Sequence, residues 1–113
     1  MKVIMRIAKI GVVLIVFLCS MGLIAGERSK HQTHTVTIEG MKFQPEALTV
    51  ALGDTVVWIN KDLVAHTATS QTDAFDSKMI SPDKSWRLTV RKPGEIAYIC
   101  TYHQTMKATL RVE

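Results

Sequence analysis

Three side chains that can bind a soft metal ion stand close together near the end of the chain: Cys100, His103 and Met106. They supply a thiolate, an imidazole and a thioether at steps of three residues, directly after a segment that resembles a β-strand. Sulfur ligands favour Cu(I) and imidazoles suit Cu(II), so this set indicates one mononuclear copper site. Such a site needs a second imidazole, and His66 is the natural candidate.

The same residues also fit other kinds of site. Zinc accepts two histidines and a cysteine, but methionine is an uncommon zinc ligand. A cysteine with a histidine is also the nucleophile and base of some enzymes, although no Gly-rich oxyanion loop or helix N-terminus is evident beside Cys100. Taken singly, Met106 would be a core residue and each histidine a solvated or hydrogen-bonded one. The four together favour copper, whereas His31 and His34 lack a soft partner and are expected to be surface residues or incidental metal binders.

The N-terminus has the pattern of an export segment. Lys2, Arg6 and Lys9 precede an uncharged run from Ile10 to Gly26, which is followed by polar residues. Residues 1–26 are therefore predicted to be a cleaved signal peptide or a retained membrane anchor, with possible membrane attachment through residues 10–26, and the domain to be periplasmic or otherwise extracytoplasmic. If the signal is removed, Cys19 leaves with it. Cys100 is then a lone thiol in an oxidising compartment, which favours a metal ligand or a reactive nucleophile over a passive core residue.

Charge excludes one class of partner. The 113 residues carry 14 Lys and Arg against 10 Asp and Glu, but three of the basic residues precede the apolar run. From Glu27 onward the balance is 11 against 10, a net charge of +1. Binding of nucleic acid requires a clustered basic excess, so no nucleic-acid partner is expected.

The rest of the chain reads as one all-β domain. Residues 27–32 form a polar linker, and residues 33–113 are long enough for a single small core. Short β-branched and aromatic segments separated by Gly and Pro turns predict a β-sandwich or barrel. The expected strands are Thr33–Ile38, Ala47–Leu52, Thr55–Asn60, Ser85–Val90, Glu95–Cys100 and Lys107–Val112. A turn of helix is possible within Asp73–Ile80, and strand parity predicts that Tyr98 and Cys100 both point inward.

Several of these segments resemble the cupredoxins, the type I blue copper proteins, and in particular their amicyanin and plastocyanin branch. The likeness includes Phe43-Gln-Pro45, Gly53 to Asn60, His66-Thr67, Phe75-Asp-Ser77 and Tyr98-Ile-Cys100, and the short Cys-x-x-His-x-x-Met step is similar to that of amicyanin. The resemblance implies a Greek-key sandwich with copper held at one end by His66, Cys100, His103 and Met106. It also implies that His103 passes the electrons, inside an apolar patch.

The resemblance implies an electron carrier that is not an enzyme. The expected partners are redox proteins, a dehydrogenase donor and a cytochrome or oxidase acceptor, and the expected state is a monomer. The alternative is a domain that stores or delivers copper; a structural zinc domain ranks third.

The chain departs from the family at several positions. Tyr102 and Gln104 stand where prolines are frequent, so the Tyr102 amide could donate to the Cys100 sulfur. Thr67, which follows His66, is expected to tie the His66 loop to the Cys100 loop. Gln104 makes the surroundings of His103 more polar and Lys107 adds a charge there, and the sequence leaves open whether they alter docking.

Overall fold

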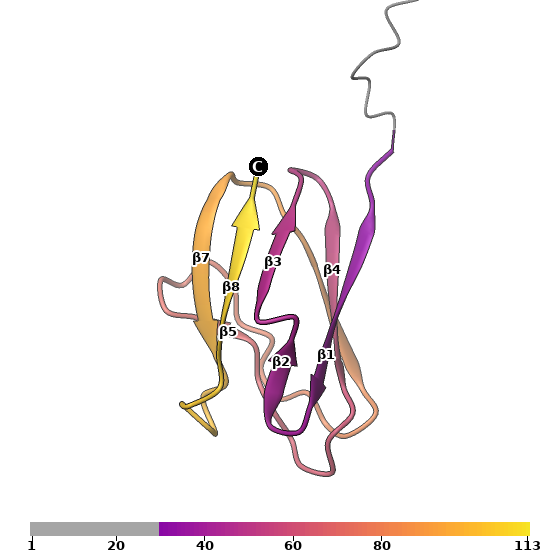
Figure 1. Ribbon diagram of the computed structural model, residues 1–113, viewed down its shortest axis with the longest axis vertical. Coiled ribbons are helices and arrows are strands. Elements are labelled where there is room, and N and C mark those ends of the chain that lie inside the picture. Colours follow the sequence, from indigo (N-terminus) through magenta and orange to yellow (C-terminus); the bar gives the residue numbers. More distant parts are fainter. Residues whose placement is uncertain (1–29) are drawn as a thin grey trace, which may run out of the picture.

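The computed structural model describes residues 30–113, which form a sandwich of two four-stranded sheets (Figure 1). The predicted signal or anchor, residues 1–26, and the first half of the predicted linker, residues 27–29, lie outside the described residues. Within residues 30–113 no helix is long and apolar enough to cross a membrane. The all-β sandwich predicted from the sequence is confirmed.

The first sheet has the strand order β2-β1-β4-β6. Its members are β1 (Thr33–Glu39), β2 (Lys42–Gln44), β4 (Thr55–Asn60) and β6 (Ser85–Thr89). The second sheet has the order β3-β8-β7-β5. Its members are β3 (Ala47–Val50), β5 (Thr69–Ser70), β7 (Gly94–Ile99) and β8 (Lys107–Val112).

The chain crosses repeatedly between the two sheets, which makes two of the pairings parallel. β1 pairs with β4 in parallel, and β3 pairs with β8 in parallel. The remaining pairings are antiparallel, including β7 with β8, which places the ends of these two strands side by side. The loop from residue 100 to residue 106 joins them at the end of the sandwich opposite the C-terminus (Figure 1).

All six predicted strands are present, with bounds shifted by two residues or fewer at either end. Two short strands, β2 and β5, were not predicted, because runs of three and two residues carry no periodic signal. The possible helical turn within Asp73–Ile80 is wrong. Asp73 and Lys78 have φ angles of 59° and 58°, so the backbone there turns in the left-handed region and forms no helix.

The core lies between the sheets and is rich in aromatic rings. β4 alternates between buried and half-buried positions, with Val56, Trp58 and Asn60 pointing inward. Tyr98 and Cys100 are 2% and 0% exposed, so the predicted shared inward parity is confirmed. Burial raises the pKa of Tyr98 to about 12, although a hydrogen bond from Trp58 opposes the shift. Cys100 therefore extends from a strand whose inward-facing side chains lie in the buried core.

Candidate metal centre

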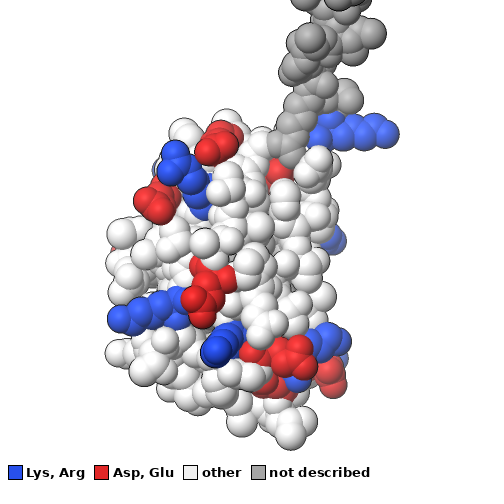
Figure 2. All heavy atoms as spheres, in the orientation of Figure 1, with Lys and Arg blue, Asp and Glu red and all other residues white. Residues whose placement is uncertain are grey.

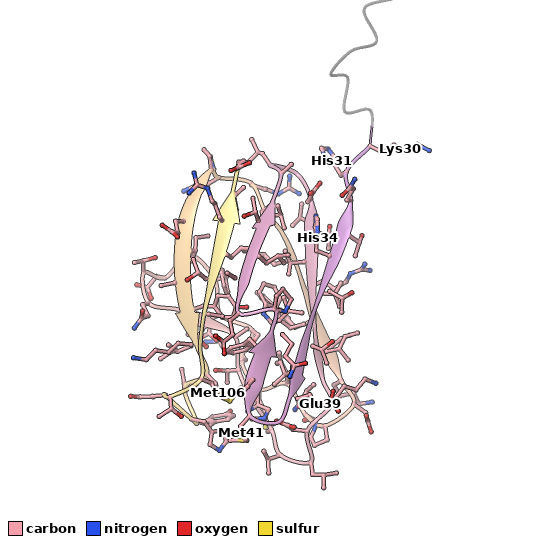
Figure 3. All side chains as sticks on the ribbon, viewed as in Figure 1. Lys30, His31, His34, Glu39, Met41 and Met106 are labelled. Carbon is pink, nitrogen blue, oxygen red and sulfur yellow. The ribbon has the colours of Figure 1, made fainter. Side chains whose placement is uncertain are left out.

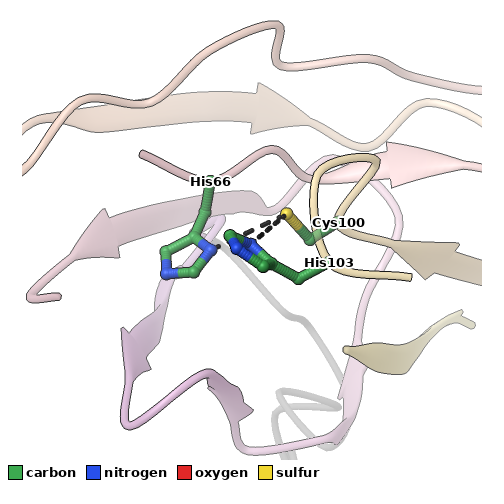
Figure 4. Close-up of side chains that lie close together, drawn as sticks. All are labelled: His66, Cys100 and His103. Carbon is green, nitrogen blue, oxygen red and sulfur yellow. Dashed lines mark hydrogen bonds between the residues drawn. The ribbon is translucent and has the colours of Figure 1, made fainter. Parts of the chain in front are cut away.

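His66, Cys100 and His103 lie together at one end of the sandwich (Figure 4). Their ligand-type atoms all lie within 4.8 Å of one another. Cys100 Sγ is 3.7 Å from His66 Nδ1 and 3.8 Å from His103 Nδ1. The two imidazole rings meet edge to face, with centroids 5.2 Å apart. One thiol thus faces the Nδ1 atoms of two imidazoles, a donor set that suits copper or zinc.

Cys100 and His103 are positioned by β7 and the loop that follows it. Cys100 is the first residue after β7, and its side chain points inward, as that of Tyr98 does two residues earlier. The Met106 amide donates to the His103 carbonyl at 2.9 Å, and the Cys100 amide donates to the Met106 carbonyl at 3.2 Å. These bonds close the loop into a tight turn. Cys100, His103 and Met106, which stand three residues apart, therefore lie in one compact loop between the paired strands β7 and β8.

Met106 returns beside Cys100 and is buried, with 3% of its surface exposed. Figure 3 shows it at the end of the domain opposite His31 and His34. A methionine thioether is a long, weak axial ligand in copper sites that have two histidines and one cysteine. The burial of Met106 fits a core methionine as well as a metal ligand.

His66 reaches the site from the loop that follows β4. Its backbone pairs with Ile80, with hydrogen bonds of 3.1 and 2.7 Å in the two directions. Asn60, fully buried at the end of β4, donates from Nδ2 to the carbonyls of Val64 and Ile80 at 2.8 and 2.9 Å. The loop is therefore held on both sides before any metal binds, which keeps the fully buried His66 ring in place.

Asp62 fixes the orientation of the His66 ring. Its Oδ2 lies 2.8 Å from His66 Nε2, so the carboxylate accepts a hydrogen bond from the N–H of that nitrogen and leaves Nδ1 free to face Cys100. The same carboxylate accepts hydrogen bonds from the amides of Gly40 and Met41, at 2.7 and 2.9 Å. Burial opposes ionisation, but the bonds from Met41, His66 and Gly40 outweigh it and lower the pKa of Asp62.

Thr67 ties the His66 loop to the Cys100 loop, as the sequence predicted. Its hydroxyl accepts a hydrogen bond from the Thr101 amide at 2.9 Å and lies 3.0 Å from the Thr101 hydroxyl. Its amide donates to Cys100 Sγ at 3.4 Å. The backbone bond to sulfur found in residues 30–113 thus comes from Thr67 and not from Tyr102. Gln104 and Lys107 are exposed beside His103, as expected.

Sequence reasoning missed Asp62 and Asn60, although a carboxylate four residues before a candidate histidine ligand was visible in the sequence. It also placed His34 with the surface residues. His34 lies far from the metal centre, at the other end of the sandwich (Figure 3), where its Nε2 is 2.8 Å from the fully buried carboxylate of Asp54. His31 is exposed, and its ring packs against Gly53.

The end of the domain that holds the metal centre is apolar. Five of the exposed large hydrophobic residues lie in the turns and loops there: Met41, Leu63, Val64, Met79 and Tyr102. The lowest part of the molecule in Figure 2 likewise shows no charged side chain, and the basic and acidic residues gather above it. His103, which is half-buried, lies in the same loop as Tyr102.

The sequence of this chain matches a known protein family and several known proteins. Residues 10–112 match the family model described as a cupredoxin-like domain. Amicyanin of Paracoccus versutus is 31% identical over 83 residues, and the match covers 69% of this chain and 63% of that protein. Amicyanin-alpha of Methylorubrum extorquens is 28% identical, with 69% and 70% covered. The chain thus spans less than two thirds of the length of the first of these relatives.

Solved structures show the same arrangement of strands. A mutant of amicyanin in the Cu(I) form superposes with a TM-score of 0.68 at 28% identity, covering 72% of this chain and 82% of the other. A copper-containing nitrite reductase from Thermus scotoductus gives a TM-score of 0.67 at 30% identity, but only 22% of that longer chain is covered. The shared fold therefore occurs both alone and as a part of larger copper proteins.

Proposed function

The chain belongs to the cupredoxin-like domain family, and we propose on that basis that it carries single electrons on one type I copper ion. The proposed ligands are His66, Cys100, His103 and Met106. The observation that carries the proposal is the pair of imidazole Nδ1 atoms at 3.7 and 3.8 Å from one buried thiol. A copper ion held there would supply the Cu(II)/Cu(I) couple.

The surrounding hydrogen bonds support rapid electron transfer. The Cys100 loop is closed on itself, the His66 loop is held by Asn60 and Ile80, and Thr67 joins the two. Ligands that are held this firmly move little when the charge of the metal changes. A small rearrangement lowers the barrier to electron transfer, so the rigidity of these loops favours a carrier.

Four protein ligands would leave no open position for a substrate, by the reasoning that separates closed from open zinc sites. We therefore propose that the protein is not an enzyme. Electrons would enter and leave at His103, which is half-buried beside the apolar end of the domain. The proposed partners are redox proteins, a dehydrogenase as donor and a cytochrome or oxidase as acceptor. Lys107, exposed beside this end, would influence which of them dock.

We also propose that the protein acts outside the cytoplasm. Residues 1–26 have the sequence pattern of an export signal or anchor, and the amicyanin relatives support an extracytoplasmic carrier of this kind. The domain would act in the periplasm as a monomer, either free or attached to the membrane through residues 10–26.

An absorption spectrum of the full chain loaded with Cu(II) and then reduced with ascorbate tests the proposal. An intense visible band from the thiolate-to-copper transition should appear and then bleach. The Cys100→Ser variant should lack this band, because the transition requires the thiolate. A colourless wild-type protein that holds zinc tightly, or no metal, would end the proposal.

A second candidate function, copper storage or delivery, is favoured by two exposed thioethers beside the His66 loop. Met41 is 40% exposed and its amide binds Asp62; Met79 is 61% exposed and precedes Ile80, the backbone partner of His66. Thioethers are ligands for Cu(I). Easy loss of Cu(I) to a competing chelator, slowed when Met41 and Met79 are changed to leucine, would support delivery. Retention of Cu(I) with fast self-exchange would support the electron carrier.

A further inference from the structure

The end of the sandwich opposite the metal centre is the end at which the described chain begins. Lys30, the first described residue, lies there together with the C-terminus (Figures 1 and 3). Two turns meet at the same end, because the Leu52 amide donates to the Glu113 carbonyl and the Gly53 amide donates to the Val90 carbonyl, both at 2.8 Å. We call this surface the tether end, and it consists of residues 30–33, 51–54, 90–95, 111 and 113.

Leu52 is an apolar side chain at the tip of a braced turn. It is 46% exposed, and the other exposed large hydrophobic residues of residues 30–113 lie at the end that holds the metal centre. The buried carboxylate of Asp54 accepts hydrogen bonds from the amides of Ala51 and Gln32, at 3.0 and 2.9 Å. The turn is therefore fixed in place, so Leu52 loses little conformational freedom when it enters an apolar phase.

Basic residues outnumber acidic ones around Leu52. Arg111 is paired with Glu113 at 3.2 Å and is the register partner of Glu95. Asp73 lines the same hollow as Arg91 and Lys92. Even with these three carboxylates included, the excess of charge is positive. The exposed basic side chains of the tether end are Lys30, Arg91, Lys92 and Arg111.

The sequence before the tether end brings this surface close to a membrane. Residues 10–26 are the uncharged run that we propose as a membrane attachment. Residues 27–32, between that run and β1, span at most about 20 Å when fully extended. So short a link keeps the domain at the bilayer surface at a high effective concentration, and weak contacts are then enough to hold it there.

We propose that the tether end docks on an anionic phospholipid bilayer. Leu52 enters the boundary between headgroups and acyl chains, and Lys30, Arg91 and Lys92 contact lipid phosphates. The metal centre, at the opposite end, then points away from the bilayer, and its apolar surroundings stay open to proteins in solution. This docking rests on the proposed attachment through residues 10–26 and does not depend on copper.

Fluorescence quenching of the metal-free full chain in lipid vesicles tests the docking. The vesicles consist of phosphatidylglycerol with brominated acyl chains, and bromine quenches only a tryptophan that comes close to it. Leu52→Trp reports on the tether end, and Leu63→Trp, at a 96% exposed position in the loop before His66, reports on the opposite end. The parent chain supplies the background of its own tryptophans. Quenching should be several-fold greater for Leu52→Trp than for Leu63→Trp.

Charge variants separate docking from mere attachment. In the Leu52→Trp chain, Arg91→Gln/Lys92→Gln should reduce the quenching several-fold, and so should raised salt or brominated phosphatidylcholine in place of phosphatidylglycerol. The matched control is Lys61→Gln/Lys84→Gln, which removes the same charge from exposed positions next to the end of β4 that leads to His66. This control should quench like the Leu52→Trp chain itself.

Equal quenching of the two introduced tryptophans would overturn the docking, and so would quenching that is the same in both lipids and in the Arg91/Lys92 variant. A full chain that stays free of the vesicles would overturn it as well. If the coloured copper complex forms and Leu52→Trp is not quenched, the proposed electron carrier stands and the docking fails. If the quenching follows the charge variants but no coloured complex forms, the docking stands and the proposed copper function fails.

Discussion

Asp62 and His66 are joined by a 2.8 Å hydrogen bond on the side of the imidazole that faces away from Cys100. His66 Nδ1, on the other side of the ring, lies 3.7 Å from Cys100 Sγ. The carboxylate also binds the turn between β1 and β2 through the amides of Gly40 and Met41. One side chain thus connects a surface turn to a candidate copper ligand and sets which nitrogen of that ligand is available.

Replacing Asp62 by asparagine should weaken copper binding. The variant keeps an oxygen that can accept the Nε2 proton but loses the negative charge that makes the imidazole a better donor. Loss of such a partner typically lowers metal affinity about 10- to 100-fold. Cu(II) should be affected more than Cu(I), so the midpoint potential should rise. Competition with a chelator and cyclic voltammetry measure the two effects, and Asp76→Asn, at another carboxylate with a lowered pKa, is the matched control. Equal affinity and potential in the two variants would contradict this role of Asp62.

The same carboxylate should make the stability of the metal-free domain depend on pH. The pKa of Asp62 is lower in the folded protein than its usual value of 3.8. The folded state therefore binds fewer protons, and Asp62 contributes its full stabilisation above about pH 4. This contribution is lost as the pH falls through the lowered folded value. Urea unfolding at pH 7 and near pH 3 should show a smaller loss of stability in Asp62→Asn than in the wild type. Identical losses in both would mean that other carboxylates account for the acid sensitivity.

Thr67→Val should destabilise the metal-free domain by about 0.5–1.5 kcal/mol, because it removes the hydroxyl that accepts part-buried hydrogen bonds from the Thr101 amide and the Thr69 hydroxyl. The side chain is nearly the same size, so packing around the 3% exposed site should change little. Urea denaturation gives the free energy of unfolding. Thr55→Val is the control, since its hydroxyl pairs with that of Thr89 in an exposed hydrogen bond, and it should change stability by less than about 0.5 kcal/mol. A Thr67 variant as stable as the control would show that the loops are held by other contacts.

Met106→Ala should keep a coloured copper site but shift its potential, because the bond to an axial thioether is long and weak. The same variant should also lower stability by about 2–5 kcal/mol, the usual effect of truncating a buried methionine. Met79→Ala changes a 61% exposed methionine at the same end and should alter neither property much. If Met106→Ala lowers stability while spectrum and potential stay the same, Met106 is a core residue and not the fourth ligand.

Much of the fold could be predicted because its strands carry strong local signals. β4 and β8 agree with their predicted bounds at both ends, since β-branched and aromatic residues alternate there between turn residues. β2 and β5 could not be found, because they form only where a longer neighbour supplies hydrogen-bond partners. Met41 illustrates the point: it adopts a φ of 60° in the turn that returns β2 onto β1, and no local preference of methionine indicates this.

The sequence by itself determined the identity and spacing of Cys100, His103 and Met106, because all three lie in one short loop whose ends are paired strands. It also determined that Thr67, as a polar neighbour of His66, would face the other loop. Only the tertiary structure decided that His66 Nδ1 approaches the thiol, since the two residues are 34 positions apart and meet because the sheets stack. The tertiary structure alone placed Asp62 against the turn at Gly40, and it alone packed Trp86 against Trp58. Such contacts depend on strand register and on the direction of side chains across the sandwich.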